Sequence, residues 1–236
     1  MCGQSDYDLR CEWGLQGVNA LASISDVLIV VDVLSFSTAV DIAVARGAAV
    51  LPYRWRDSSA EAFAASRGAL LAAHRSAAGE YSLSPASLES IPAQTALVLP
   101  SPNGSTLCLH TGGVVTFTAC LRNSAAVASR ARSCGTRIAV IPAGERWNDG
   151  SLRPGIEDWI GAGAVLAELP GRLSPEADLA VAAFERFRCN LHDVLARCCS
   201  GKELLKRGFA RDVALAAEYR ASTAAPLLRE DRFVNA

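Results

Sequence analysis

Four groups of polar side chains each follow a short apolar run of the sequence. Hydroxyl groups and helix N-termini bind phosphate oxygens, and Asp and Glu carboxylates suit a hard divalent cation such as Mg²⁺. This combination therefore points to phosphate chemistry assisted by a metal. The groups are Asp32 with Ser35, Ser37 and Thr38; residues 101–106, with Asn103, Gly104 and Ser105; Arg122 with Asn123 and Ser124; and Glu145 with Arg146, leading to Glu157 and Asp158.

Each group also has a purely structural explanation. Asp32 or Asn123 could cap the helix that follows it, and Asn103-Gly104 is a strong turn dipeptide. Glu157 and Asp158 could complement the positive end of a helix dipole. Their recurrence after successive predicted strands favours a shared site, because ligands of open α/β sheets bind beyond the carboxyl ends of the strands.

The elements that must position these groups follow a repeated order of strand, loop and helix. This order predicts an α/β fold with a largely parallel sheet and helices on both faces. No linker or repeat divides the chain, so one domain over residues 1–236 is expected. The predicted strands are 26–32, 48–52, 95–99, 114–119 and 137–141, and the predicted helices are 39–45, 58–73, 123–133, 156–169, 174–198, 201–206 and 213–219.

The composition excludes several classes of protein. A net charge of −1 with scattered Arg argues against a nucleic-acid binder. No secretory signal is visible, and the apolar run 27–31 is far too short to span a bilayer, so we expect a cytoplasmic protein. Disulfides are then disfavoured, and Cys108, Cys120 and Cys134 are expected to fill the core. The apolar content permits a homodimer interface without requiring one.

The order of these motifs resembles the 2-phosphosulfolactate phosphatase family, from about residue 26 to about residue 228. The resemblance implies a three-layer α/β/α fold with a largely parallel or mixed central sheet. It also implies Mg²⁺-dependent hydrolysis of a phosphate monoester on a small sulfonated acid, near a step of coenzyme M biosynthesis. The motifs are 31–34 with Ser37-Thr38, 102–105, 123–127, 143–145 and 157–163, followed by a similar ending at 201–204 and 208–213.

One residue departs from the family pattern. The family commonly has Arg after Asp-Val-Leu, whereas this chain has Ser35. An Arg side chain offers a permanently charged, bidentate fork for phosphate or sulfonate, which a hydroxyl group cannot replace. The substrate is therefore expected to be 2-phosphosulfolactate or a related phosphorylated acid.

The resemblance makes Asp32, Asn103, Glu157 and Asp158 the leading catalytic candidates. We expect Asp32 with Glu157 or Asp158 to hold Mg²⁺, and either a carboxylate or a metal-activated water to attack phosphorus. Arg122 or Arg146 could supply the positive charge that Ser35 lacks. The expected substrate-binding residues are Ser35, Ser37, Thr38, Gly104, Ser105, Arg122, Asn123, Glu145 and Arg146.

Two other functions compete with this prediction. The same fold could bind a phosphorylated or anionic metabolite without turning it over, with Ser35 as a trace of lost catalysis. A nucleotide-linked oxidoreductase is disfavoured, because no Gly-x-Gly-x-x-Gly follows the first predicted strand.

Overall fold

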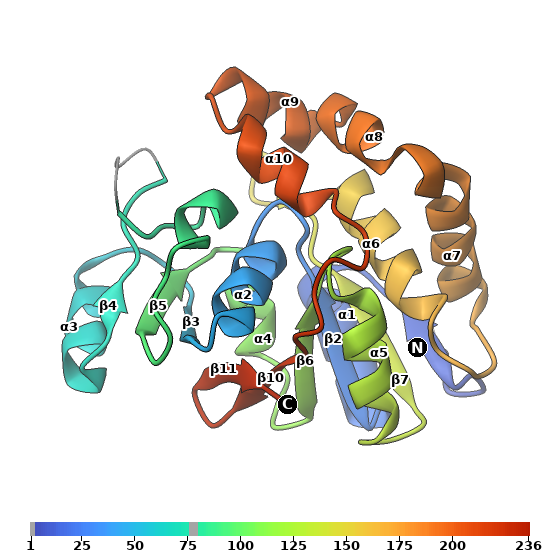
Figure 1. Cartoon of the computed structure of the whole chain (residues 1–236). Helices are drawn as coiled ribbons and strands as arrows, with labels where there is room; N and C mark the ends of the chain where they lie inside the picture. The colour runs from blue at the N-terminus through green and yellow to red at the C-terminus, as the bar shows by residue number, and fades with distance from the viewer. Residues whose placement is uncertain (1–2, 76–79) are drawn as a thin grey trace.

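Helices pack on both faces of a mixed, largely parallel sheet, which is the predicted α/β class (Figure 1). The structure is a computed structural model and describes residues 3–75 and 80–236. Within these residues the sheet has nine strands in the order β1-β7-β2-β6-β10-β11-β3-β5-β4. Its strands are β1 (Leu9–Cys11), β2 (Val27–Val31), β3 (Ala49–Tyr53), β4 (Leu70–Leu71), β5 (Ala96–Pro100), β6 (Val115–Ala119), β7 (Ile138–Pro142), β10 (Pro226–Arg229) and β11 (Arg232–Asn235).

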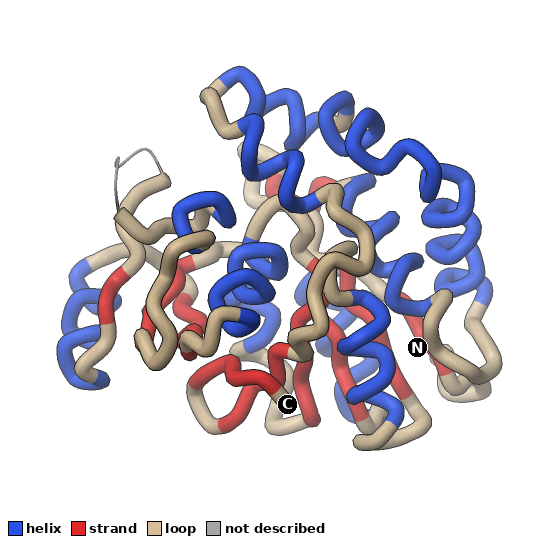
Figure 2. The backbone as a smooth tube through the Cα atoms, viewed as in Figure 1, coloured by secondary structure: helices blue, strands red, loops and turns tan. Residues whose placement is uncertain are grey.

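The helices alternate with these strands along most of the chain (Figure 2). A separate two-stranded ribbon, β8 (Glu145–Arg146) with β9 (Leu152–Arg153), follows β7. The helices are α1 (Gly14–Leu21), α2 (Phe36–Ala45), α3 (Ser58–Arg67), α4 (Gly104–Cys108), α5 (Ser124–Arg132), α6 (Ile156–Leu166), α7 (Pro175–Phe187), α8 (Leu191–Arg197), α9 (Cys199–Lys206) and α10 (Ala210–Ala216).

The sheet consists of two parallel blocks joined by an antiparallel hairpin. In the first block β2 lies between β7 and β6, and in the second block β3 and β4 flank β5, all in parallel register. The hairpin β10–β11 joins the blocks through one residue pair on each side, Leu227 with Phe117 and Phe233 with Val50. The hairpin was not predicted from the sequence, because its partners lie more than 100 residues away.

The core is divided by the alternation of side chains along β2. Val27, Ile29 and Val31 belong to a cluster that includes residues of α5, α6 and α7. Leu28 and Val30 belong to a second cluster, which includes residues of α1, α2 and α4. Successive side chains of a strand point to opposite faces, so a fully apolar strand requires cover on both sides. Figure 1 shows α8, α9 and α10 lying above the end of β2 at which the chain turns into α2.

The five predicted strands are confirmed to within a residue or two. Three predicted helices differ from the structure by three residues at an end, namely 39–45, 156–169 and 213–219, and two more are considerably shorter than expected. The expected helix 58–73 ends at Arg67, because Gly68 adopts a left-handed conformation (φ 59°) that terminates it. The expected helix 174–198 is interrupted by a 3₁₀ turn at Arg188–Asn190, which separates α7 from α8.

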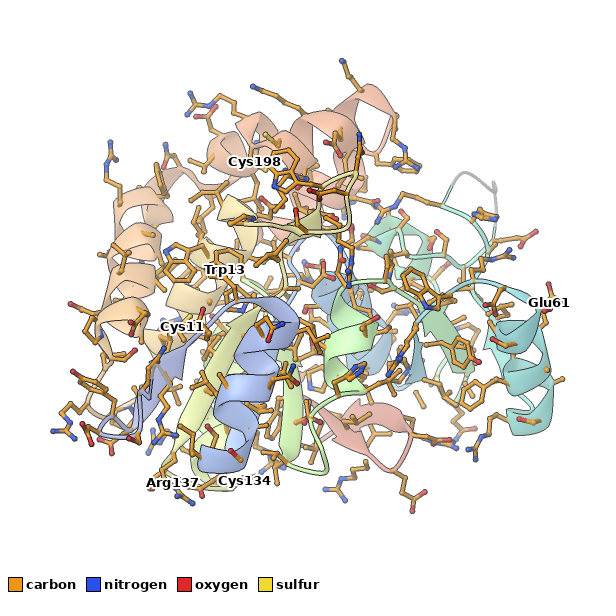
Figure 3. All side chains as sticks on the ribbon, turned by 180° about the vertical axis from the view of Figure 1, so that it is seen from behind. Cys11, Trp13, Glu61, Cys134, Arg137 and Cys198 are labelled. Carbon is orange, nitrogen blue, oxygen red and sulfur yellow. The ribbon has the colours of Figure 1, made fainter. Side chains whose placement is uncertain are left out.

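The cysteines are unpaired thiols wherever the structure describes them. Cys108 and Cys120 are buried, as expected of small apolar residues. The prediction for Cys134 is wrong: this side chain is exposed, because it lies just beyond the end of α5 rather than on its packed face (Figure 3).

Within the described residues, no helix is both long and apolar enough to cross a membrane.

Helices α6 and α7 approach each other at Gly163. A Cβ atom added there would lie 1.9 Å from the main-chain oxygen of Ala180, which cannot move without shifting α7. Replacing Gly163 by Ala should therefore lower the free energy of unfolding by about 1–3 kcal/mol, the usual cost of overpacking a core.

Urea unfolding would measure this change, with Gly3→Ala as the control. The nearest atom to a Cβ at Gly3 is 3.6 Å away, which is an ordinary contact. Equal stability of the two variants would contradict the close approach of α6 and α7.

Candidate active site

Asp32 lies at the carboxyl end of β2 and is 7% exposed. Its Oδ1 accepts a hydrogen bond from the main-chain N–H of Phe36 at 3.2 Å, at the start of α2. Its Oδ2 accepts from the N–H of Gly104 at 3.0 Å, at the start of α4. Because α4 follows β5, this carboxylate connects the strand ends of both parallel blocks. A side chain could not replace Gly104, since a Cβ there would lie 2.3 Å from the Phe36 ring.

Asp158 makes a similar connection within the first block. Its Oδ1 accepts from the N–H of Val33 at 2.7 Å, and its Oδ2 accepts from the N–H of Gly144 at 2.8 Å. These donors follow β2 and β7, so Asp158 holds the ends of two neighbouring strands together. Asp158 and the adjacent Glu157, in the first turn of α6, are each 3% exposed.

Asn103 and Glu145 bring the second and fourth polar groups together. The amide Nδ2 of Asn103 donates to Oε2 of Glu145 at 2.8 Å. Asn103 precedes α4 and Glu145 begins β8, so this contact joins the loop after β5 to the loop after β7. Both residues line a cavity with Asp32, which confirms that these sequence motifs converge in space.

Burial and mutual repulsion alter the acidity of these carboxyl groups. Burial raises the pKa of Asp32 to about 7. The charges of Glu145 and Glu157 contribute to this increase, whereas the two N–H donors act to lower the pKa. Burial likewise raises the pKa of Asp158 well above its ordinary value, with contributions from Asp32 and Glu157. Burial also raises the pKa of Glu145, which the Asn103 amide partly offsets. A bound cation would reverse these effects, because it favours the ionised forms.

The cavity beside Asp32 has a volume of about 180 Å³ and is lined by groups of both charges. Helix α9 closes one side with Ser200, Glu203 and Leu204, and Arg207 follows directly after it. The other cavity-lining residues are Asp32, Leu34, Ser35, Arg75, Leu83, Ser101, Pro102, Asn103 and Glu145.

Three of the predicted hydroxyl residues do not line the cavity and instead form hydrogen bonds with main-chain groups near it. Ser37 Oγ accepts from the N–H of Asp32 at 2.8 Å, and Thr38 Oγ1 donates to the carbonyl of Val33 at 2.8 Å. Ser105 Oγ donates to the carbonyl of Leu99 at 3.0 Å. All three are buried and fix the backbone around Asp32 and Gly104.

The two predicted cationic residues lie elsewhere. Arg122 pairs with Asp41 at 2.9 Å and with Glu218, outside the lining of the Asp32 cavity. Asn123 is beside it, with its Oδ1 accepting from the N–H of Cys120 at 2.8 Å. Arg146 is exposed and borders two neighbouring hollows next to Glu145. The cavity instead contains Arg75 and Arg207.

Arg75, Ser200, Glu203 and Arg207 were missed by the sequence reasoning. Glu203 lies within residues 201–204, which resemble the family's C-terminal motif. This resemblance was a signal from which Glu203 could have been found. Arg75 had none, because it lies in an irregular stretch between β4 and β5.

Cys198 adds a neutral group beside Glu157. It precedes α9, where its Sγ accepts from the N–H of Gly201 at 3.3 Å (Figure 3). Burial raises the pKa of this thiol to about 12, and the nearby Glu157 charge contributes. The thiol therefore remains protonated at neutral pH and adds no negative charge to the group.

The donor chemistry around Asp32 suits a hard cation. Each oxygen of Asp32 accepts one N–H bond, which leaves lone pairs available to a metal. The pKa values of Asp32 and Asp158 are raised first by burial and then by the charges of neighbouring carboxyl groups, and a bound cation would offset both effects. Across residues 3–75 and 80–236, no three His, Cys, Asp or Glu side chains are gathered in a ready metal-binding arrangement.

The comparison with known families agrees with this chemistry. The family described as 2-phosphosulpholactate phosphatase matches residues 16–231. The chain belongs to this family. Its members are phosphoric monoester hydrolases, so this is an enzyme of that class. The match begins ten residues before the resemblance noted in the sequence and includes all of the site. No curated protein sequence matches the chain in direct comparison.

The raised pKa values predict how stability depends on pH without metal. Asp32 has an ordinary pKa of 3.8 and a folded value of about 7, so between these values the folded protein binds more protons than the unfolded chain. The free energy of unfolding should therefore fall as the pH rises from 5 to 7, by up to about 1.4 kcal/mol per pH unit for each such group. Asp158 and Glu145 act in the same direction.

Urea unfolding at several pH values in a chelator would measure this slope. Glu145→Gln should flatten it, because the amide can still accept from Asn103 while the charge next to Asp32 is lost. Glu61→Gln, on the exposed surface of α3, should leave it unchanged (Figure 3). Stability that rises from pH 5 to pH 7 would refute the assignment.

Proposed function

We propose that this chain hydrolyses the phosphate monoester of a small acid with the help of Mg²⁺, and that the acid is 2-phosphosulfolactate or a close relative. Family membership over most of the chain supports the reaction class. The observation that carries the proposal is the position of Asp32. Its carboxylate is fixed by the N–H groups of two helices at the wall of a small cavity that also contains guanidinium groups.

The residues of the cavity have distinct roles in this proposal. Asp32 acts on the phosphoryl group either as a ligand of the metal or as the nucleophile. Asn103 offers its amide to the substrate and is oriented by Glu145. Hydrogen-bond donors and cations that surround the transferring group stabilise the charge that develops on its oxygens. The small size of the cavity favours a short substrate.

Asp32 and Glu157 are the residues that we expect to hold Mg²⁺, with Asp158 as the further candidate. Asp158 does not line the cavity, so its main contribution is to hold the strand ends in place through the two main-chain N–H bonds that it accepts. A bound Mg²⁺ would polarise a phosphoryl oxygen and neutralise the buried carboxylates. A cytoplasmic location and a place near a step of coenzyme M biosynthesis belong to the same proposal and rest on the family resemblance.

Removal of the Asp32 charge should abolish most of the activity. Asp32→Asn is expected to lower kcat roughly 100- to 10,000-fold, the range for loss of a group that acts directly in proton transfer or on the reacting centre. The measurement is phosphate release from a panel of small phosphorylated acids that includes 2-phosphosulfolactate. Asp26→Asn is the control, since Asp26 pairs with Arg137 at the far end of the sheet (Figure 3).

The outcomes of this panel separate the competing functions. Full activity of Asp32→Asn would refute the assigned role. Binding of these acids to the wild type without phosphate release would favour a non-catalytic binder. Turnover of other acids but not of 2-phosphosulfolactate would keep the reaction and exclude that substrate.

Mg²⁺ should also stabilise the folded protein in the absence of substrate. At a Mg²⁺ concentration ten times its Kd, the free energy of unfolding should rise by about 1.4 kcal/mol. Thermal unfolding with and without Mg²⁺ would measure this effect, which Asp32→Asn should reduce and Asp26→Asn should not. A wild-type protein whose unfolding ignores Mg²⁺ but whose phosphatase activity is intact would argue for metal-free catalysis.

A further inference from the structure

Arg75 is a partly buried cation at the wall of the Asp32 cavity. Its side chain is 10% exposed, and it belongs to none of the four polar groups recognised in the sequence. The same cavity carries the carboxyl groups of Asp32, Glu145 and Glu203. A phosphorylated acid brings further negative charge, so its binding requires cations placed close to these groups.

Four contacts hold the Arg75 guanidinium in one orientation. Nη1 pairs with Oδ2 of Asp212 at 2.5 Å, and Nη2 donates to Ser35 Oγ at 2.6 Å and to the carbonyl of Leu83 at 3.1 Å. The guanidinium carbon lies 5.3 Å from the centre of the Phe209 ring. A group that is already immobilised loses little entropy when it binds a ligand.

Asp212 is itself held firmly. Its Oδ1 accepts from Ser84 Oγ at 2.5 Å and from the N–H of Ala86 at 3.1 Å, and the residue is 1% exposed. Asp212 therefore orients Arg75. The contact with Asp212 would be sufficient for a purely structural ion pair. Arg75 also contacts the loop that follows Asp32.

Ser35 is the residue that Arg75 reaches in this loop. It is three positions after Asp32 and 3% exposed, and its short side chain leaves room for the guanidinium at 2.6 Å. A guanidinium has five N–H donors, and the contacts above use three of them. Within the described residues, the remaining donors of Arg75 have no protein acceptor.

We propose that Arg75, positioned by Ser35 and Asp212, binds the oxygens of the phosphoryl group beside Asp32. This assignment rests on the proposed function. A cation from a distant part of the chain thereby supplies the charge that the loop after β2 lacks. It replaces Arg122 and Arg146, neither of which lines this cavity.

Inorganic phosphate is the probe that tests this contact without turnover. Titration calorimetry in the presence of Mg²⁺ would compare the wild type with Arg75→Met combined with Asp212→Asn, so that no unpaired carboxylate remains buried. The double variant should bind phosphate roughly 10- to 100-fold more weakly, as expected for lost charge-assisted hydrogen bonds. Arg75→Lys, which keeps the charge but not the fork, should give a smaller loss.

Arg211→Met is the matched control. Arg211 is adjacent to Asp212 but is exposed, pairs with Glu89 and lies outside the cavity. Its loss should leave phosphate affinity unchanged, and thermal unfolding would verify that every variant is folded. Unchanged phosphate affinity in the folded double variant would overturn the proposal.

A parallel titration with methanesulfonate identifies the group that Arg75 contacts. Weaker binding of phosphate alone supports the proposal, whereas weaker binding of methanesulfonate alone would assign Arg75 to the acid end of the substrate and overturn it. A wild type that binds phosphate through Arg75 but hydrolyses no ester would support this contact and refute the phosphatase function. No phosphate binding by the wild type would overturn the contact.

Discussion

The site depends on one buried carboxylate that joins the two parallel blocks of the sheet. The oxygens of Asp32 accept N–H groups from the first turns of α2 and α4, which follow strands of different blocks. This arrangement fixes the distance between the loop after β2 and the loop after β5. It also requires a negative charge in a place with little water, where the ionised form is disfavoured. The neighbouring Glu145 and Glu157 increase that cost.

Other features of the site can be understood as responses to this charge. Asp158 uses the same kind of contact to hold β2 and β7, so two carboxylates set the geometry of three strand ends. Arg75 and Arg207 bring positive charge to the cavity, and Cys198 places a neutral thiol beside Glu157. This combination of charges suits the metal-bound phosphate ester that we propose as the ligand.

The parts that could be predicted from the sequence are those encoded by local pattern. The apolar run 27–31 predicts a buried strand on its own, and Asp32 must then lie at its carboxyl end. The same logic placed Asn103, Glu145 and Glu157 at one edge. The positions of Arg75 and Arg122 depend on Asp212 and Asp41, which are distant in sequence, so residue type alone could not distinguish the cavity cation from the structural one. The short α4 and the hairpin β10–β11 were missed for the same reason: tertiary partners stabilise them.

The position of the hairpin determines when the sheet can be completed during synthesis. Residues 226–235 leave the ribosome after both blocks of the sheet, yet they lie between them. Phe233 of the hairpin packs edge-on against Phe36, with ring centres 6.1 Å apart, next to the N–H that Asp32 binds. The nascent chain can therefore form each block early, but it completes the sheet beside Asp32 only after residues 226–235 have been synthesised. Until then the edges of β3 and β6 are unpaired on that side, which is the stage at which a chaperone would be of most use.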